Sequence, residues 1–506
     1  MQTVVIPTVG LGSRLAPLTD NINKSLLPYK NKPIISYIIE NFDVDTRFII
    51  PIGYNAQQVK DFLTLSYGEQ MFTFVYVDNY NDPLSGPGST MQCCKDLIDS
   101  PFWYIPCDTY FEEILETPLN DTVYYKDVPE NLSDQYTMLK LDQSKITDLS
   151  FKKNQTSVWV GFTGVMYIKD YQNFFKRLTH SEIVFAIENN TDAKVLNSWI
   201  DLGNLEIYKQ ENFKHQNYDF TKTDELTVFS NNKVLKWYKE CSIPRKKYLK
   251  YKSNPSVYPN NVTYTNNWLA YDFSQGKVVY KNYSLSIFKE MLNWLDIEVW
   301  KISKQNIYEN CIDFYKNKTY DRINKFLQNN KKLPVINYVN ETKVKQYEYY
   351  LNEINWEELA SENLPSLIHG DLHFDNVIYD TEKFKIIDWR HDFGGSNLYG
   401  DTYYDLAKLL GGLIIDYSQI KNNNFSIKIE NDKAHLNIPK IKHNGDYIYM
   451  LKDFVISKGW SYKKTQQLVP IIYWNMAPLH TYPFNLLIWY LGIEMFEILL
   501  NGKDIG

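Results

Sequence analysis

The stretch SLIHGDLHFDNVIYDTEKFKIIDWRHDFGG, residues 366–395, carries three polar side chains at a spacing that indicates a reaction type. Asp371 follows a short apolar run, Asn376 lies five residues later, and Asp388 ends another apolar run twelve residues after Asn376. We predict a strand, a loop and two further short strands, which would bring the three side chains to one site. Phosphoryl transfer from ATP needs such a set: a carboxylate to orient and deprotonate an acceptor hydroxyl, and an amide and a carboxylate to hold Mg²⁺ on the phosphates.

The motif HGDLHFDN, followed by IDW, resembles the catalytic core of the aminoglycoside phosphotransferase and choline kinase superfamily. The resemblance extends over about residues 225–506 and implies an α+β protein-kinase-like domain. It also implies that ATP is the donor, that Asp371 is the catalytic base, and that Asn376 and Asp388 bind Mg²⁺. The segment 400–409 (GDTYYDLAKL) would form the helix that braces the catalytic loop.

Other polar residues near this motif receive different interpretations. The resemblance assigns Lys236, in NNKVLKWYK, to the ATP phosphates, although no glycine-rich loop precedes it and no partner glutamate is identified. His369 and His373 are interpreted as residues that fix the loop by hydrogen bonds, because no third ligand follows at zinc-like spacing. Asp401 and Asp405 are interpreted as structural.

A group of aromatic residues near the C-terminus has two readings. Most aromatic clusters of this kind belong to a hydrophobic core, but one could also form a cation–π cage for a quaternary ammonium ligand. The residues concerned are Tyr473, Trp474, Trp489 and Tyr490.

The chain opens with a different pattern, VVIPTVGLGSRLAPLTDNINKSLLPY, residues 4–29. Gly10 and Gly12 follow the first expected strand, and a turn without side chains lets backbone N–H groups approach phosphate oxygens closely. Arg14 and Lys24 add two cations, suited to a triphosphate and an acceptor phosphate. The sequence therefore predicts a phosphate-binding turn at this position.

Two acidic residues are expected to complete the N-terminal site. Asp108 ends the buried run FWYIPCD, and Asp201 lies in the turn of WIDLGN. Two carboxylates on Mg²⁺ opposite two cations suit the in-line attack of a phosphate on the α-phosphorus of an NTP.

These segments, together with SGPGSTMQC and VGFTGVMYI, resemble the nucleotidyltransferase family that includes the sugar-1-phosphate pyrophosphorylases and the bacterial CTP:phosphocholine cytidylyltransferases. The resemblance covers residues 1 to about 213 and implies a GT-A-like fold. By that resemblance, the nucleotide is gripped and activated by Gly10, Gly12, Arg14 and Lys24, the base is lined by Ser85, Gly86 and Gly88, and Mg²⁺ is held by Asp108 and Asp201.

Two departures from the family pattern bear on specificity. Asn23 precedes Lys24 where the family usually has proline. Hexose-specific members carry Glu-Lys-Pro where this chain has LSFKKN, residues 149–154, so no glutamate is available for sugar hydroxyls. This difference favours a small phosphorylated alcohol or amino-alcohol, with Lys152 or Lys153 as a contact for its phosphate.

The pattern of apolar runs predicts an α/β chain with two domains, at 1–218 and 219–506. The first is expected to be a doubly wound mixed sheet, with a β-rich extension at 135–170. The second is expected to be mainly helical after about residue 285, with a hairpin insertion at 425–439. The expected strands of the first domain are 2–6, 47–51, 72–77 and 102–106, and its expected helices are 34–43, 56–64 and 89–98.

Composition excludes several classes of protein. A net charge of −6 and a pI of about 5.9 argue against a basic face for nucleic acid. Five cysteines without metal-binding spacing, no signal-peptide pattern and no apolar run of membrane-spanning length favour a cytoplasmic protein. The sequence does not determine the oligomeric state, and a homo-oligomer is one of the possibilities.

The two expected reactions can follow one another. The kinase half would phosphorylate a small hydroxylated acceptor, choline-like in the favoured interpretation, and the other half would join that phosphate to NMP, with CTP favoured, and release pyrophosphate. The product would be an activated precursor for cell-surface polysaccharide or lipid. Two alternatives are a sugar or polyol kinase fused to an NDP-sugar pyrophosphorylase, and a nucleotide-binding scaffold with one active half. Each half is expected to fold alone.

Overall fold

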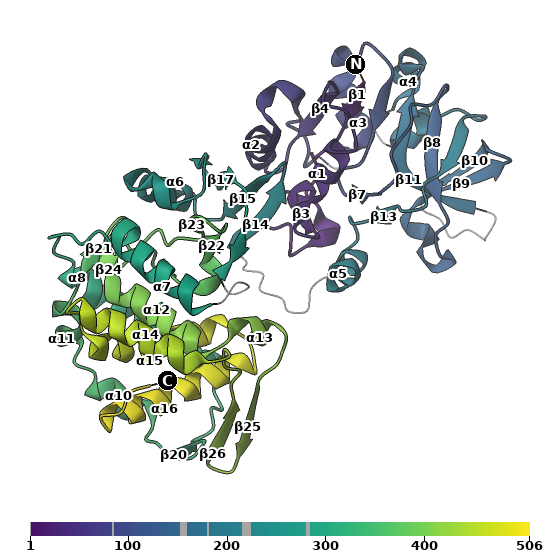
Figure 1. Cartoon of the computed structure of the whole chain (residues 1–506). Helices are drawn as coiled ribbons and strands as arrows, with labels where there is room; N and C mark the ends of the chain where they lie inside the picture. Colours follow the sequence, from purple (N-terminus) through teal and green to yellow (C-terminus); the bar gives the residue numbers. More distant parts are fainter. Residues whose placement is uncertain are drawn as a thin grey trace. The chain divides into compact units, whose positions relative to one another are not determined.

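A computed structural model describes residues 2–82, 85–151, 159–179, 182–214, 224–279 and 284–505. The chain divides into two compact units (Figure 1). The first comprises Met1–Glu240 and Thr265–Ala270, and the second comprises Cys241–Tyr264 and Tyr271–Gly506. The boundary expected between 218 and 219 lies outside the described residues and stays a prediction.

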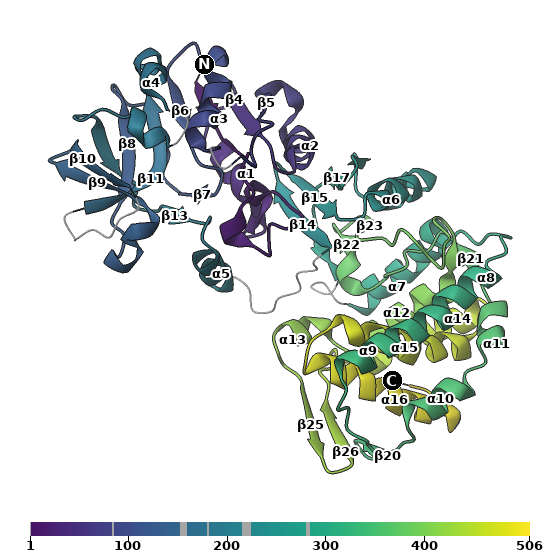
Figure 2. The same cartoon turned by 180° about the vertical axis from the view of Figure 1, so that it is seen from behind.

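A nine-stranded mixed sheet forms the centre of the first unit, and Figure 2 shows it from behind. Strand β1 is parallel to β4 and β6, and β4 is parallel to β5, whereas β11 runs antiparallel to β6 and starts the β-rich extension. In spatial order the strands are β5 (Phe72–Tyr76), β4 (Arg47–Ile52), β1 (Thr3–Val5), β6 (Phe102–Tyr104), β11 (Trp159–Ile168), β8 (Thr122–Lys126), β12 (Asp192–Val195), β10 (Lys145–Phe151) and β9 (Thr137–Asp142).

Helices cover both faces of the parallel part of this sheet. Successive side chains of a strand point to opposite faces, and the core divides accordingly. Val4 packs in one cluster with residues of α1 (Ile34–Ile39) and α2 (Ala56–Tyr67), while Val5 packs in another with residues of α3 (Pro87–Cys94). The expected doubly wound mixed sheet is confirmed. The remaining elements near it are α4 (Tyr171–Arg177), α5 (Leu205–Phe213), β2 (Pro28–Tyr29), β3 (Lys32–Pro33), β7 (Thr109–Tyr110) and β13 (Ile200–Asp201).

The first unit also contains strands that begin at residue 225 or later. Strands β14 (Glu225–Ser230) and β15 (Lys233–Tyr238) form a hairpin whose turn residues, Asn231 and Asn232, have φ of 46° and 56°. The Asn-Asn pair in the sequence predicts such a turn, because Asn adopts this left-handed conformation more readily than most residues, and the structure confirms it. Strand β17 (Trp268–Asp272) lies next to β15.

These strands contribute side chains to the core of the first unit. Val228, Leu235, Trp237 and Trp268 belong to the cluster that contains Val4 and the buried residues of α2. The Asn231 side-chain amide donates to the Ser66 carbonyl at 2.7 Å, at the C-terminal end of α2. Fragment 1–218 lacks the side chains that β14, β15 and β17 contribute, so we expect it to be less stable than the same unit in the full chain.

Trp268→Ala should destabilise the first unit by about 3–5 kcal/mol. The indole is fully buried, its ring centroid lies 5.4 Å from that of Phe62, and its Nε1 donates to the Gln58 carbonyl at 3.2 Å. Urea denaturation of the full chain would measure the loss, with the exposed Tyr76 replaced by alanine as the matched control. An unchanged urea midpoint for Trp268→Ala would show that β17 does not contribute to the core of the first unit.

The second unit is mainly helical after residue 285, as expected. Its helices are α6 (Ser242–Ser253), α7 (Leu285–Trp294), α8 (Tyr308–Cys311), α9 (Lys318–Asn329), α10 (Tyr347–Glu353), α11 (Trp356–Ser361), α12 (Thr402–Ile414), α13 (Tyr417–Lys421), α14 (Asn444–Ser457), α15 (Tyr462–Met476) and α16 (Phe484–Leu500). Its strands are β16 (Thr263–Tyr264), β18 (Lys277–Val278), β19 (Tyr338–Val339), β20 (Thr342–Lys343), β21 (Pro365–Ser366), β22 (Val377–Tyr379), β23 (Phe384–Ile386), β24 (Gly400–Asp401), β25 (Ser426–Glu430) and β26 (Lys433–Asn437).

Two further expectations for this unit are confirmed. Strands β25 and β26 form the hairpin insertion. The aromatic residues near the C-terminus, Tyr473, Trp474, Trp489 and Tyr490, are all buried, and the Trp474 and Trp489 rings stack with centroids 5.4 Å apart. They form core rather than a ligand cage. Among the helices of the described residues, none is both long and apolar enough to cross a membrane.

Candidate functional sites

The turn after β1 has the conformation that glycine permits. Gly12 has φ of +69°, and a Cβ there would come within 2.9 Å of the Thr19 side chain, while the Thr19 hydroxyl donates to the Gly12 carbonyl at 2.9 Å. At Gly10 an added Cβ would meet open space. The turn continues into a short 3-10 helix, Ser13–Leu15, on which Arg14 is exposed. Its backbone and guanidinium are therefore accessible to an anionic ligand.

Asn23 fixes the position of Lys24. Its buried side-chain amide donates to the carbonyls of Thr8, at 2.8 Å, and Tyr54, at 2.7 Å, and its Oδ1 accepts from the Ser25 N–H at 3.0 Å. These contacts explain how the chain accommodates asparagine where the family has proline. They hold the 3-10 turn Lys24–Leu26 in place.

Lys24 and Asp108 form an ion pair at the edge of the sheet, with Nζ 2.7 Å from Oδ2. Asp108 follows β6, so parallel strands β1 and β6 deliver the glycine turn and this carboxylate to the same edge. Burial opposes ionisation of Asp108, but the Lys24 ammonium and Arg14 outweigh it and keep the pKa of this carboxyl below its usual value.

Asp201 lies beside Asp108 although 93 residues separate them in the sequence. Strands β13 and β7 pair Asp201 with Thr109, and the Tyr136 hydroxyl and Gly203 N–H donate to its carboxylate at 3.1 and 2.9 Å. A Cβ on Gly203 would lie 2.5 Å from Asp108 Oδ2 and 3.0 Å from Asp201 Oδ1, so both carboxylates converge on one point. Burial and the Asp108 charge raise the pKa of Asp201.

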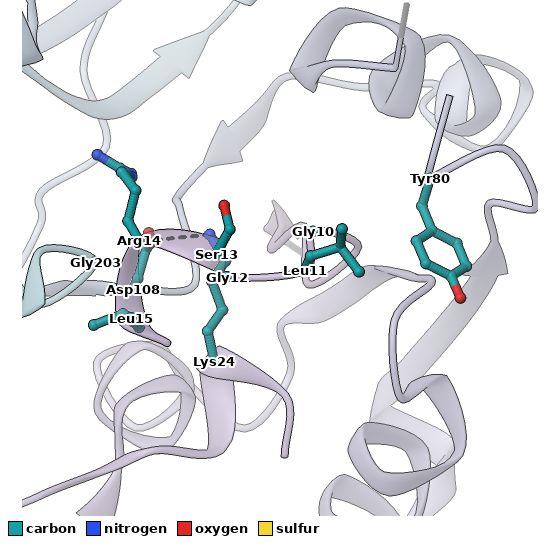
Figure 3. A pocket seen from close by; sticks show the side chains of 10 residues that line it. All are labelled: Gly10, Leu11, Gly12, Ser13, Arg14, Leu15, Lys24, Tyr80, Asp108 and Gly203. Carbon is teal, nitrogen blue, oxygen red and sulfur yellow. Dashed lines mark hydrogen bonds and ion pairs between the residues drawn. The ribbon is translucent and has the colours of Figure 1, made fainter. Parts of the chain in front are cut away.

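A cavity of about 290 Å³ connects these groups, and Figure 3 shows the Lys24–Asp108 pair beside the glycine turn, with Tyr80 apart from it. Asp108 lines the cavity, and Asp201 approaches Asp108 beside the lining residue Gly203; two carboxylates placed in this way fit a divalent cation with oxygen ligands. The lining residues are Gly10, Leu11, Gly12, Ser13, Arg14, Leu15, Lys24, Tyr80, Asp108 and Gly203.

The residues that line this cavity differ in part from those that the sequence predicted for the site. Ser85, Gly86 and Gly88 lie at the start of α3, outside the set that lines the cavity, so their role stays a prediction. Lys152 and Lys153 lie outside the described residues. Tyr80 and Gly203 were not assigned; Gly203 belongs to the quoted WIDLGN motif, whereas nothing in the sequence around Tyr80 points to this cavity.

Asn23→Ala should lower kcat/KM of the N-terminal reaction about tenfold or more, because two buried carbonyls lose their donor at a cost of ~1–3 kcal/mol and Lys24 loses its support. The melting temperature should fall as well. Asn189→Ala, at an exposed position, is the matched control for both measurements. Wild-type kinetics for Asn23→Ala would show that Lys24 is positioned by other contacts.

In the second unit, the loop that carries Asp371 is anchored by Asp405 of α12. The Asp405 carboxylate accepts from the backbone N–H groups of His369, at 2.7 Å, and Gly370, at 2.8 Å. The Asn376 side-chain amide donates to the Asp371 carbonyl at 2.9 Å. Helix α12 therefore supports the loop as predicted, and Asp405 is one of the groups through which it does so.

A backbone hairpin brings Asn376 and Asp388 together. Strands β22 and β23 pair, and the Ile387 N–H, next to Asp388, donates to the Asn376 carbonyl at 2.9 Å. Strand β23 ends at Ile386, two residues before Asp388, whereas the sequence suggested that the apolar run ends at Asp388 itself. Asp388 adopts a left-handed φ of 60°. Oxygen ligands from Asn376 and Asp388 fit a Mg²⁺ ion beside the loop.

Lys408, which the sequence did not single out, pairs with Asp371 at 2.8 Å. It lies three residues after Asp405 on α12, so both face the loop. Burial opposes ionisation of Asp371, but Lys408 and the rings of His373 and His369 outweigh it and hold the pKa of Asp371 far below its usual value. The Asp371 side chain is 41% exposed, so a substrate can reach the ionised carboxylate.

Both histidines hold the loop, in agreement with the sequence-based interpretation. His369 is fully buried, its Nε2 lies 2.7 Å from the Ile387 carbonyl, and burial lowers its pKa to about 3. His373 Nε2 lies 3.1 Å from Asn376 Nδ2. Across the described residues, no group of three or more His, Cys, Asp or Glu side chains is arranged to hold a metal ion.

Lys236 lies on β15 in the first unit and is buried. Its Nζ is 3.8 Å from Oε1 of Glu225 on β14, which supplies a carboxylate partner that the sequence did not identify. Its assignment to ATP stays a prediction.

Comparisons with known proteins match two different parts of the chain. A model of the phosphotransferase enzyme family matches residues 321–423. The N-terminal part is similar to the bifunctional protein GlmU of Methanocaldococcus jannaschii, with 30% identity over 154 residues, which cover 28% of this chain and 35% of that protein. It is also similar to the choline-phosphate cytidylyltransferase of Streptococcus pneumoniae, with 29% identity over 148 residues, which cover 29% of this chain and 62% of that protein.

The chain thus spans less than two thirds of the length of either relative. A crystal structure of a UDP-glucose pyrophosphorylase complexed with UDP-glucose matches with a TM-score of 0.37 and 19% identity, over 42% of this chain and 98% of that one. The N-terminal part is thus similar to nucleotidyltransferases, and residues 321–423 match the phosphotransferase enzyme family.

Proposed function

We propose that the chain is a bifunctional enzyme that phosphorylates a small hydroxylated acceptor with ATP and then transfers CMP from CTP to the new phosphate, releasing pyrophosphate. The observation that supports the proposal is the presence of a set of reactive groups in each unit. Lys24, Asp108 and Asp201 meet in the first, and Asp371 is held beside Asn376 and Lys408 in the second.

In the kinase reaction, the acceptor oxygen attacks the γ-phosphorus, its proton passes to Asp371, and ADP leaves. The Asp371 carboxylate stays ionised because its pKa is low, so it orients the hydroxyl and accepts the proton only as the new bond forms. Asn376 and Asp388 are the groups that would hold Mg²⁺.

In the transferase reaction, an oxygen of the acceptor phosphate attacks the α-phosphorus of CTP and pyrophosphate leaves. Arg14 and Lys24 neutralise phosphate charge, and the glycine turn supplies backbone N–H groups. Asp108 and Asp201 would hold Mg²⁺, which when bound offsets repulsion between the two phosphate groups. The similarity to a choline-phosphate cytidylyltransferase supports CTP and a phosphorylated alcohol.

The acceptor has two candidate classes. An amino-alcohol such as choline follows from the missing Glu-Lys-Pro motif and from the cytidylyltransferase relative. A sugar or polyol is the alternative, and the GlmU relative supports it. The product would serve cell-surface polysaccharide or lipid synthesis.

A screen of NTPs against unphosphorylated acceptors, with ATP and Mg²⁺ present, tests the proposal. We expect pyrophosphate release that depends on ATP as well as on the second NTP, with CTP the best, and phosphorus NMR should show the phosphorylated acceptor before the CDP product. Pyrophosphate release from an unphosphorylated acceptor without ATP would contradict the order of reactions.

A further inference from the structure

Four basic side chains form a group near the catalytic carboxylate of the second unit, and one of them, Arg390, lies against Gly370, the residue before Asp371. Lys408 pairs directly with Asp371. Lys318 Nζ lies 3.6 Å from the centroid of the Phe314 ring, and Arg390 Cζ lies 5.0 Å from the same centroid. Arg322 follows Lys318 by four residues on α9, so the two lie on the same face of that helix.

The basic side chains of this cluster outnumber the carboxylates that form ion pairs with them. Within the described residues, Lys408 is the one member with an ion-pair partner, and that partner is Asp371 itself. Burial and the cations Arg390, Arg322 and Lys408 hold the pKa of Lys318 well below its usual value. Such like-charge clusters cost stability, and proteins keep them where a ligand supplies the opposite charge.

We propose that the acceptor phosphorylated by the second unit carries a carboxylate or phosphate group, which Lys318, Arg322 and Arg390 bind while its hydroxyl faces Asp371. The inference rests on the proposed kinase function and specifies its substrate class. It places a hydroxy acid, a hydroxylated amino acid or a phosphorylated polyol ahead of choline, whose fixed positive charge the cluster repels. The buried aromatic residues near the C-terminus offer no alternative cage for choline.

Matched acceptor pairs test this in the full chain with ATP and Mg²⁺. Glycerate is compared with glycerol, and serine with ethanolamine and choline, with ADP formation as the readout. We expect kcat/KM to be at least ~10-fold higher for the anionic member, because hydrogen bonds between charged groups are the stronger ones. A neutral or cationic acceptor used better than every anionic one would overturn the inference and leave the kinase function standing.

Variants of α9 test whether Arg322 binds the anionic group of the acceptor. Arg322→Gln should raise the KM for the anionic acceptor about tenfold, leave the KM for ATP unchanged, and melt no lower than wild type, because it relieves repulsion. Arg322→Lys should restore most of the affinity, and Lys325→Gln, exposed on the same helix, is the control. A rise in the KM for ATP alone, or equal effects of Arg322→Gln and Lys325→Gln, would overturn the inference.

A binding measurement separates this inference from the proposed function. With ADP and Mg²⁺ saturating, glycerate and inorganic sulfate should raise the melting temperature of wild type, and Arg322→Gln should reduce that shift. If no acceptor is phosphorylated but the shift and its loss are seen, the kinase proposal fails and the anion site stands. Equal shifts in wild type and Arg322→Gln would overturn the anion site.

Discussion

Asp371→Ala should abolish phosphorylation of the free acceptor, with a loss of at least ~10²-fold, while CMP transfer to a pre-phosphorylated acceptor continues. The carboxylate orients the acceptor hydroxyl and takes its proton, and Lys408 cannot take that proton because an ammonium has no acceptor lone pair. The loop should keep its shape, since Asp405 binds the backbone N–H groups of His369 and Gly370 and not the Asp371 side chain.

Two assays on one preparation check this: ADP formation from the free acceptor, and pyrophosphate release with the phosphorylated acceptor and CTP. Glu382→Gln, exposed in the turn between β22 and β23, should behave as wild type in both. If Asp371→Ala lost both reactions while remaining folded, the two reactions would not belong to separate sites.

Asp201→Asn should have the complementary effect, lowering CMP transfer by at least ~10²-fold while the kinase reaction continues. Asp201 and Asp108 converge beside Gly203, and neither Arg14 nor Lys24 can replace an anionic oxygen ligand of a divalent cation. Phosphorylated acceptor should therefore accumulate without CDP product, as phosphorus NMR in one reaction mixture can show. Normal product formation would remove Asp201 from the site.

The pH dependence of the same reaction offers a second check. Burial and the Asp108 charge raise the pKa of Asp201, so this carboxyl keeps its proton to a higher pH than an ordinary aspartate. Only the ionised form can bind a cation, so CMP transfer should fall as pH decreases through the raised pKa, and higher Mg²⁺ should restore it by favouring the ionised form. A profile independent of Mg²⁺ would contradict this linkage.

Much of the fold follows from local pattern. Alternating strands and helices predicted the doubly wound sheet, and the Asn231–Asn232 pair predicted a hairpin turn, because each depends on neighbouring residues. The convergence of Asp371 and Asn376 was also predictable, since five residues in one loop separate them. These features need only the preferences of short segments and the periodicity of their apolar residues.

The sequence by itself thus indicated the resemblance to two kinds of transferase and the candidate residues of each site. The resemblance had placed Asp108 and Asp201 in one site, but tertiary structure alone decided that Lys408 pairs with Asp371 and that Trp268 belongs to the core of the first unit. Each of these contacts joins segments far apart in the chain, and no local periodicity encodes which distant side chains meet. The charge imbalance around Asp371 has the same origin, because the four cations come from three separate segments that only packing brings together.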